Sequence, residues 1–252
     1  MAKSFETEDH AAVARRFLPT GAQLIAPQYP PGSKIVQPMG TSRHPENLLA
    51  SYRHEEGLKT IILEKTTDGW KKAAEIDNPG YDTVNYRSFL DLTGEGKKSI
   101  VLGLTKNGKD PVLYGYLLDG GNAIQLFACN YSRFQVLKPR ISETAGNKAY
   151  LAVWNKTDLG TYSIEVLHWN GARLETTENL TRYYCRKIMP YIVRMVKRAP
   201  YKPSNWYSLA NTLTKAGLNM DALQAIEIGM KLDPDPALRE KFVLLNKKII
   251  ES

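Results

Sequence analysis

A short loop after residue 90 carries oxygen-bearing side chains at alternate positions. In the stretch DLTGEGKKS these side chains belong to Asp91, Thr93 and Glu95. Calcium is a hard cation that takes several oxygen ligands from alternate positions of a tight turn, and Gly94 and Gly96 would allow such a turn. These three residues are our candidate metal site, and calcium is the ion that they could hold. The alternative is a tight turn in which Asp91 accepts hydrogen bonds from the backbone.

The same loop departs from the usual calcium pattern, and the rest of the chain carries no recognised catalytic motif. The position that is usually acidic is Ser99, and Lys97 and Lys98 place positive charge beside any cation. The four histidines lack the H-E-x-x-H spacing of zinc enzymes, and there is no G-x-S-x-G nucleophile motif. We therefore expect a non-enzymatic protein without catalytic residues or a bound cofactor. A hydrolase with acids converging from separate repeats is the alternative.

The whole net charge of the chain comes from one segment. The formal net charge is +8, and residues 179–220 contain eight basic residues and no acidic one. In a helix, several of these residues would share one face opposite an apolar stripe, namely Arg186, Arg194, Lys197 and Arg198. Such a face attracts an anionic polymer, a teichoic-acid-like glycan, nucleic acid or anionic lipid, mainly by non-specific electrostatics. The alternative is a solvated face, balanced by acidic residues folded nearby.

The β-strands and turns expected to form the body of the protein recur at a fixed step along the sequence. Three hairpin signals recur along the chain, the dipeptides Asp68-Gly69, Asp119-Gly120 and Asn170-Gly171. They begin 51 residues apart, at residues 68, 119 and 170, and β-rich runs such as TIILEK, VLYGYLL and SIEVLHW keep the same step. This period is typical of a propeller blade. Three copies predict three four-stranded antiparallel sheets in an incomplete propeller, because closed propellers use four to eight blades.

The acidic loop resembles the FG-GAP or VCBS type of repeat, in which such a loop precedes a strand; the matching stretch is DLTGEGKKSIV. The whole chain is similar to an uncharacterised, mostly Firmicute group of FG-GAP-like proteins with an FLPPGAxL opening, present here as FLPTGAQL from Phe17 to Leu24. The resemblance implies a propeller-type body and favours the cell envelope as location. The group has no assigned activity, so the resemblance names no ligand.

The end of the chain has helical periodicity and resembles a tetratricopeptide repeat (TPR) at its signature spacings: Trp206, Leu209, Ala210, Leu213, Ala222, Ile226 and Pro234. We expect Ser204 to cap the first helix and Gly217 to end it. The dipeptide Asp235-Pro236 predicts the start of a further helix. These helices would either plug the open sheets or bind a peptide.

These observations predict an α+β, multidomain protein. An N-terminal helix and proline-rich lead-in would occupy residues 1–32, the β-repeats residues 33–178, and the TPR-like helices residues 179–252. We expect a binding or scaffold protein with a protein or peptide partner, held by Arg186, Arg194, Lys197, Arg198, Tyr201 and Trp206. The alternatives are a calcium-dependent adhesion or cell-envelope module and a binder of anionic polymer.

Location and assembly are less constrained by the sequence. No apolar run approaches the 18 residues or so of a transmembrane helix, and the opening MAKSFETEDH is too polar for a signal peptide. The two cysteines, Cys129 and Cys185, form no C-x-x-C pair, so they imply neither a zinc site nor a disulfide framework. An exposed flank of the β-repeats could also pair with another subunit.

Overall fold

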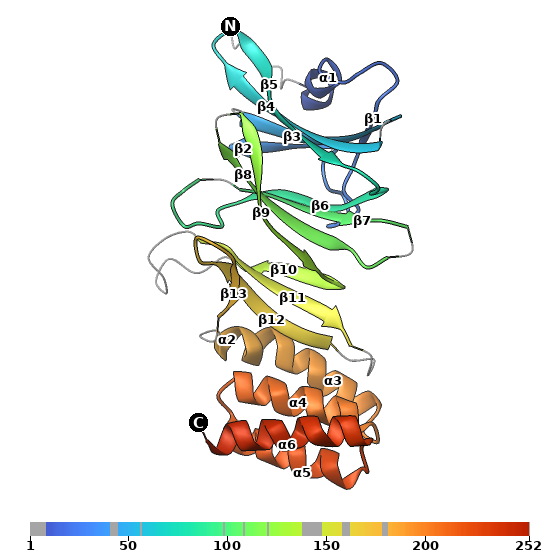
Figure 1. Ribbon diagram of the computed structural model, residues 1–252, viewed down its shortest axis with the longest axis vertical. Helices are drawn as coiled ribbons and strands as arrows, with labels where there is room; N and C mark the ends of the chain where they lie inside the picture. The colour runs from blue at the N-terminus through green and yellow to red at the C-terminus, as the bar shows by residue number, and fades with distance from the viewer. Residues whose placement is uncertain are drawn as a thin grey trace, which may run out of the picture. The chain divides into compact units, whose positions relative to one another are not determined.

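The computed structural model describes residues 9–40, 45–55, 57–97, 99–107, 109–119, 121–137, 148–157, 162–177 and 181–251. Over these ranges antiparallel sheets are followed by helices, which confirms the α+β expectation (Figure 1). The chain divides into two compact units. The N-terminal unit comprises residues 1–132, 136–150 and 169–174, and the C-terminal unit comprises residues 133–135, 151–168 and 175–252.

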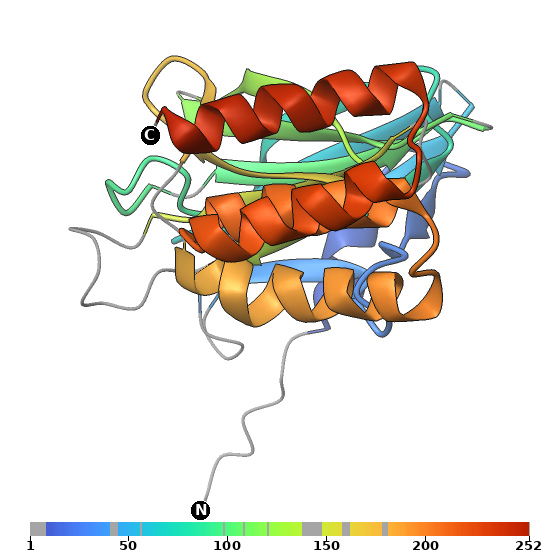
Figure 2. The same cartoon turned by 90° about the horizontal axis from the view of Figure 1, so that it is seen from below.

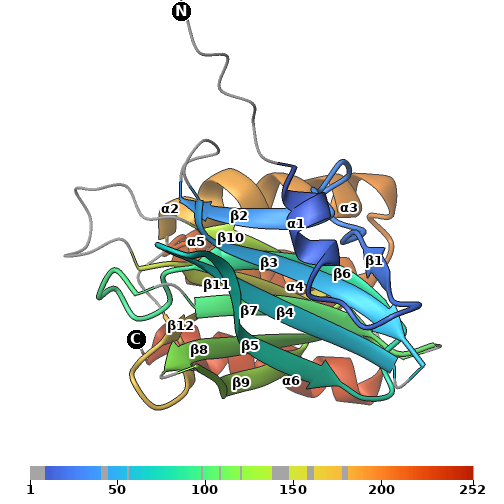
Figure 3. The ribbon, with the colours of Figure 1, turned by 90° about the horizontal axis from the view of Figure 1, so that it is seen from above.

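The first sheet has five strands, with β1 and β2 both paired to β3. These strands are β1 (Gln23–Ile25), β2 (Val36–Gly40), β3 (Pro45–His54), β4 (Gly57–Thr66) and β5 (Gly69–Asn78). A short helix, α1 (His10–Arg15), packs against β2 and β3 (Figure 3). Successive side chains of a strand point to opposite faces, so Leu48 and Ala50 pack with α1 while Leu49 packs with the second sheet. Both faces of the first sheet therefore contribute to a hydrophobic core.

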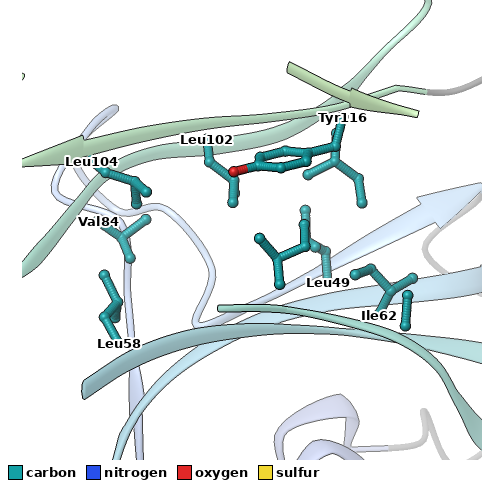
Figure 4. Packing of buried hydrophobic residues seen from close by; sticks show 10 residues of the cluster. Leu49, Leu58, Ile62, Val84, Leu102, Leu104 and Tyr116 are labelled. Atoms are coloured by element: carbon teal, nitrogen blue, oxygen red, sulfur yellow. The ribbon is translucent and has the colours of Figure 1, made fainter. Parts of the chain in front are cut away.

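The second sheet is a four-stranded meander in chain order. Its strands are β6 (Thr83–Leu90), β7 (Ser99–Thr105), β8 (Val112–Asp119) and β9 (Asn122–Asn130). The two sheets of the N-terminal unit share one core, in which Leu49, Leu58 and Ile62 meet residues of the second sheet (Figure 4). Those residues include Val84, Leu102, Leu104 and Tyr116. The β-branched and leucine-rich run of β7 is buried at every position but the last, as expected of a strand covered on both faces.

The third sheet is again a four-stranded meander, as expected, whereas the first sheet has five strands instead of the expected four because both β1 and β2 pair with β3. Its strands are β10 (Arg133–Leu137), β11 (Tyr150–Lys156), β12 (Tyr162–Trp169) and β13 (Leu174–Thr176). The 51-residue step places Ser51, Leu102 and Val153 in interior strands of the three sheets, β3, β7 and β11. Asp68-Gly69 lies at the turn from β4 into β5, which begins at Gly69, and Asn170-Gly171 lies between β12 and β13. Gly120, from the middle turn, lies outside the described residues.

The C-terminal unit ends in helices that run alongside one another (Figure 2). They are α2 (Thr181–Tyr183), the π-helix η1 (Tyr184–Ile188), α3 (Met189–Arg198), α4 (Pro203–Lys215), α5 (Asn219–Lys231) and α6 (Pro236–Ile250). The first three form one continuous helical run. The apolar stripes of α4, α5 and α6 meet in a core around Phe242, which is fully buried.

The helix ends follow local chemistry, with one correction to the expected caps. Gly217 has a φ of 71°, and the Leu218 N–H reaches back to the Leu213 carbonyl at 2.9 Å, so glycine ends α4 as expected. Asp235 Oδ1 accepts from the Leu238 N–H at 2.9 Å and starts α6. Ser204 does not cap α4. The helix begins at Pro203, two residues before the start that a Ser204 cap would give, because proline, with its fixed φ and missing N–H, suits the first helical position.

A small residue is required where α5 crosses α6. A Cβ atom added to Gly229 would lie 2.3 Å from Cζ of Phe242 and 3.0 Å from Cβ of Trp206. Both distances are shorter than an ordinary van der Waals contact between carbon atoms. The packing of Phe242 against α5 therefore depends on the absence of a side chain at residue 229.

A buried arginine links the first two sheets. Arg87 in β6 is 3% exposed, and its Nη2 donates to the carbonyl oxygens of Lys34 and Ile35 at 3.1 and 2.8 Å. Its Nε and Nη1 atoms are buried without a hydrogen-bond partner. Burial lowers the pKa of Arg87, but a guanidinium stays protonated at neutral pH. The second sheet therefore holds a partly satisfied buried charge, which costs free energy.

Candidate functional site

The basic segment predicted from the sequence lies on the continuous helical run of the C-terminal unit. Its buried side is formed by Tyr184, Ile188, Ile192 and Val196. The opposite side presents exposed cationic side chains, which we call the basic face: Arg186, Arg194, Lys197 and Arg198. The helix places them together because residues about four apart share one side. The structure therefore brings the four predicted basic residues onto one element.

These cations are not balanced by acids of the chain within the described residues. The salt bridges there lie elsewhere, as in Lys71 with Glu64 at 3.1 Å and Lys231 with Glu227 at 2.6 Å. No ion pair or hydrogen bond joins a side chain of the basic face to another described residue. The described residues therefore leave the positive charge of the basic face without a paired acid.

The two aromatic candidates differ in their surroundings. Tyr201 follows α3 and is 70% exposed. Trp206 instead packs against the core of α4, α5 and α6, and its Nε1 donates to the Pro200 carbonyl at 2.7 Å. Nearby, Asn205 is buried, and its Nδ2 donates to two carbonyls at the end of α3, at 3.0 and 3.2 Å. Tyr201 is thus open to solvent, while Trp206 and Asn205 hold the connection from α3 to α4.

Beside the basic face lies an aromatic group that the sequence reasoning missed. Trp154 of β11, Tyr162 of β12 and Tyr191 of α3 contact one another edge to face, with ring centroids 5.2 to 6.1 Å apart. The register of β11 and β12 pairs Trp154 with Ile164, two residues from Tyr162, so both rings lie on the same side of the sheet. The guanidinium of Arg133 lies over the Trp154 ring, 5.2 Å from its centroid.

Charge and burial act together on Tyr191. Burial raises the pKa of Tyr191, whereas Arg133, Arg198 and Arg194 lower it. Arg194 and Arg198 follow Tyr191 by three and seven residues and so share its side of α3. Arg133 lies over Trp154, whose ring contacts Tyr191. We call Arg133, Arg194 and Arg198 around Tyr191 the arginine cluster. Two of its arginines belong to the basic face, and the third comes from strand β10.

The sheet and helices are joined by further polar contacts beneath this site. Tyr183 donates to Gln135 Oε1 of β10 at 3.1 Å. Lys215 of α4 donates to the Ile164 carbonyl at 2.8 Å and lies 5.6 Å from the Tyr184 ring centroid. Burial lowers the pKa of Lys215, and this side chain is not part of the exposed basic face. These contacts fix the helical run against the third sheet within the C-terminal unit.

The acidic loop of the N-terminal unit is a turn organised by one buried carboxylate. Asp91 is 4% exposed; its Oδ1 accepts from the Gly94 N–H at 2.7 Å and its Oδ2 from the Gly96 N–H at 3.0 Å. Thr93 Oγ1 accepts from the Glu95 N–H at 3.3 Å, and Glu95 pairs with the Lys97 ammonium at 3.5 Å. Among the described residues, no group of three or more His, Cys, Asp and Glu side chains could hold a metal ion.

A shallow groove runs between α5 and α6. It encloses about 300 Å³ and is lined by Leu223, Ile226, Glu227, Met230, Phe242, Val243 and Asn246. Val243 is 55% exposed. The groove is mostly apolar, and its acidic residue Glu227 is paired with Lys231. Its chemistry therefore differs from that of the basic face.

Comparisons with known proteins add no assignment to this geometry. No family model matches the chain, and neither the curated proteins nor the solved structures give a significant match. None of the helices within the described ranges combines the length and the apolar character that a membrane span requires. Function must therefore be inferred from the residues themselves.

Proposed function

We propose that the chain is a non-enzymatic binding or scaffold protein whose C-terminal helices bind an acidic segment of a partner protein. The observation that carries this proposal is the basic face, where exposed cations lack ion pairs with the described residues. Clustered cations of one sign attract an oppositely charged partner and raise its rate of association. The exposed ring of Tyr201, at the end of α3, adds a side chain type that is common at interfaces.

The β-sheets would serve as the body that supports this site. We propose that they form an incomplete propeller of the FG-GAP type. Two observations support this: the four-stranded meanders recur at the 51-residue step, and the first two sheets pack through one shared core. The acidic loop would then be a structural turn of the repeat. A calcium-dependent adhesion role stays as a second proposal, which the loop's single buried carboxylate does not favour.

We also propose that α4 and α5 are a TPR-like hairpin. Its support is the antiparallel packing of the signature positions, in which Ala210, Ala222 and Gly229 are buried at the helix contacts. One hairpin offers a small concave face, so the basic face supplies the larger binding surface. An anionic polymer is the alternative partner for this surface.

The test is direct binding of a short, fluorescein-labelled peptide rich in glutamate, followed by fluorescence anisotropy. The double variant Arg194→Glu/Arg198→Glu should weaken binding at least about tenfold, because it reverses two charges at the centre of the basic face. Lys241→Glu/Lys247→Glu in α6 makes the same change in net charge away from that face, and it should alter binding much less.

Two results would refute the proposal. Equal weakening by both double variants would mean that only net charge matters. Stronger binding of a non-peptide polyanion of similar charge, such as polyphosphate, would favour the polymer alternative.

A further inference from the structure

Three arginines from two different elements lie around the contact between Trp154 and Tyr191. Arg194 and Arg198 lie one helical turn apart on α3, and Arg133 comes from β10, more than 50 residues earlier in the chain. Periodicity along a helix explains the first two positions but not the third. The convergence is therefore a property of the folded C-terminal unit and is independent of the basic stripe read from the sequence.

Arg133 is held in place by its aromatic neighbour. Its guanidinium lies over the ring of Trp154, a residue that is 4% exposed and contacts both Tyr162 and Tyr191. Such stacking orients a guanidinium and leaves its N–H edge available for a bidentate contact with an oxyanion. No described carboxylate pairs with Arg133, Arg194 or Arg198. The cluster therefore offers several oriented donors without an acceptor.

We propose that the arginine cluster binds a phosphate monoester on a side chain of the partner protein, so that the partner is a phosphorylated, acidic segment. This inference rests on the proposed function, because it names the group that the basic face recognises. Arg133 would contact the phosphate from the sheet side, and Arg194 and Arg198 from the helix side. The rest of the basic face would attract acidic residues that flank the phosphorylated position.

A phosphate group fits three arginines better than a carboxylate does. It carries a charge of about −1.5 to −2 at neutral pH and has three acceptor oxygens. A carboxylate carries a single charge and accepts one guanidinium fork well. A tyrosine hydroxyl is protonated at neutral pH, so the Tyr191 hydroxyl can donate to a phosphate oxygen.

The same site is less suited to single-stranded nucleic acid. Binding of bases requires exposed ring faces on which they can stack. Here Trp154 is buried, and its contacts with Tyr162 and Tyr191 are edge to face, at interplanar angles of 68° and 79°. The rings therefore support Arg133 and line the site, and they leave no flat platform beside the arginines.

The experiment compares three peptides that share the same glutamate-rich flanks and carry phosphoserine, serine or glutamate at the central position. Fluorescence anisotropy measures their affinities for the whole chain. We expect the phosphoserine peptide to bind at least about tenfold more tightly than the serine peptide, because it adds charge-assisted hydrogen bonds. The glutamate peptide should lie close to the serine peptide.

Single variants assign the preference to the cluster. Arg133→Gln should remove the preference for phosphoserine while leaving most of the affinity for the serine peptide. Arg186→Gln, on the basic face but outside the cluster, should weaken all three peptides by a similar factor and keep the preference. Both positions are exposed, so we expect folded proteins, and thermal unfolding checks this.

The outcomes separate the two proposals. Tight binding of all three peptides without a preference, or a preference that survives Arg133→Gln, would overturn the phosphate inference and leave the proposed function standing. Failure of every peptide to bind would overturn both. A single-stranded oligonucleotide that binds more tightly than the phosphoserine peptide, with loss in Arg133→Gln, would also overturn the inference.

Discussion

Replacing Gly229 by alanine tests how closely α5 and α6 are packed. The added Cβ would lie 2.3 and 2.9 Å from two ring carbons of Phe242, and 3.0 Å from Cβ of Trp206. A carbon contact is favourable at about 3.5–4.0 Å, so the ring must move by about 1 Å or the helices must separate. Phe242 is fully buried and contacts Tyr207 edge to face at 5.4 Å, so it has little room to move.

The magnitude follows from two opposing effects. Overpacking of a core costs about 1–3 kcal/mol. Alanine in place of glycine within a helix contributes about 1 kcal/mol of stability. Since the displaced atoms belong to a buried ring, we expect the upper part of the first range. Gly229→Ala should therefore lower the free energy of unfolding by about 1–2 kcal/mol.

Urea unfolding followed by circular dichroism measures this change, and a double variant provides the control. Phe242→Leu alone should destabilise the protein, because it removes buried ring atoms. In Gly229→Ala/Phe242→Leu the smaller side chain leaves room for the new methyl group, so the loss should be smaller than the sum of the two single losses. An increase in stability for Gly229→Ala would refute the reasoning, since it would mean that helix propensity alone decides.

Three further predictions concern the N-terminal unit. Asp91→Ala should lower the free energy of unfolding by about 1.5–3 kcal/mol without added calcium, because two backbone N–H groups lose a charged acceptor. A loss of stability seen only with calcium present would contradict this. Arg87→Met should raise the free energy of unfolding by about 1–3 kcal/mol in urea titrations, because it removes buried donors that have no partner. A decrease would show that losing the hydrogen bonds to Lys34 and Ile35 costs more than removing these donors gains. Burial raises the pKa of Tyr116 to about 12, so the unfolded chain loses this proton at lower pH than the folded chain does. The free energy of unfolding should therefore fall as pH rises from 10 to 12, by up to about 1.4 kcal/mol per pH unit. Thermal unfolding of Tyr116→Phe should show a smaller fall, and an unchanged fall would exclude Tyr116 as a cause.

Local signals predicted much of the fold. Turn dipeptides and alternating runs predicted antiparallel sheets, two of which have the expected four strands, since a hairpin is specified by a few adjacent residues. Gly217 and Asp235 marked helix ends for the same reason. The sequence did not show that β1 and β2 would both pair with β3, because pairing between strands far apart in the sequence depends on the strands that surround them in the folded sheet.

The candidate site was predicted only in part, for a physical reason. Helical spacing placed Arg194 and Arg198 on one face. Arg133 and Trp154 lie on separate strands, and their contact with Tyr191 arises from the packing of the sheet against α3. The alternation of β11 and β12 could have indicated that Trp154 and Tyr162 share a face. No linear pattern could have brought Arg133 to the same place.

The π-helix η1 determines the direction in which the charged side chains run. The buried residues Tyr184, Ile188, Ile192 and Val196 are each four positions apart. In an α-helix, every step of four residues turns about 40° past a full circle, so such a series would spiral around the axis. The wider turn of η1 rotates the chain less per residue and compensates part of that drift. On the other side, Arg186, Arg194 and Arg198 lie eight and four positions apart. They therefore follow a straighter line along the helix than an unbroken α-helix would give, which suits an extended peptide better than a ligand that winds around the helix.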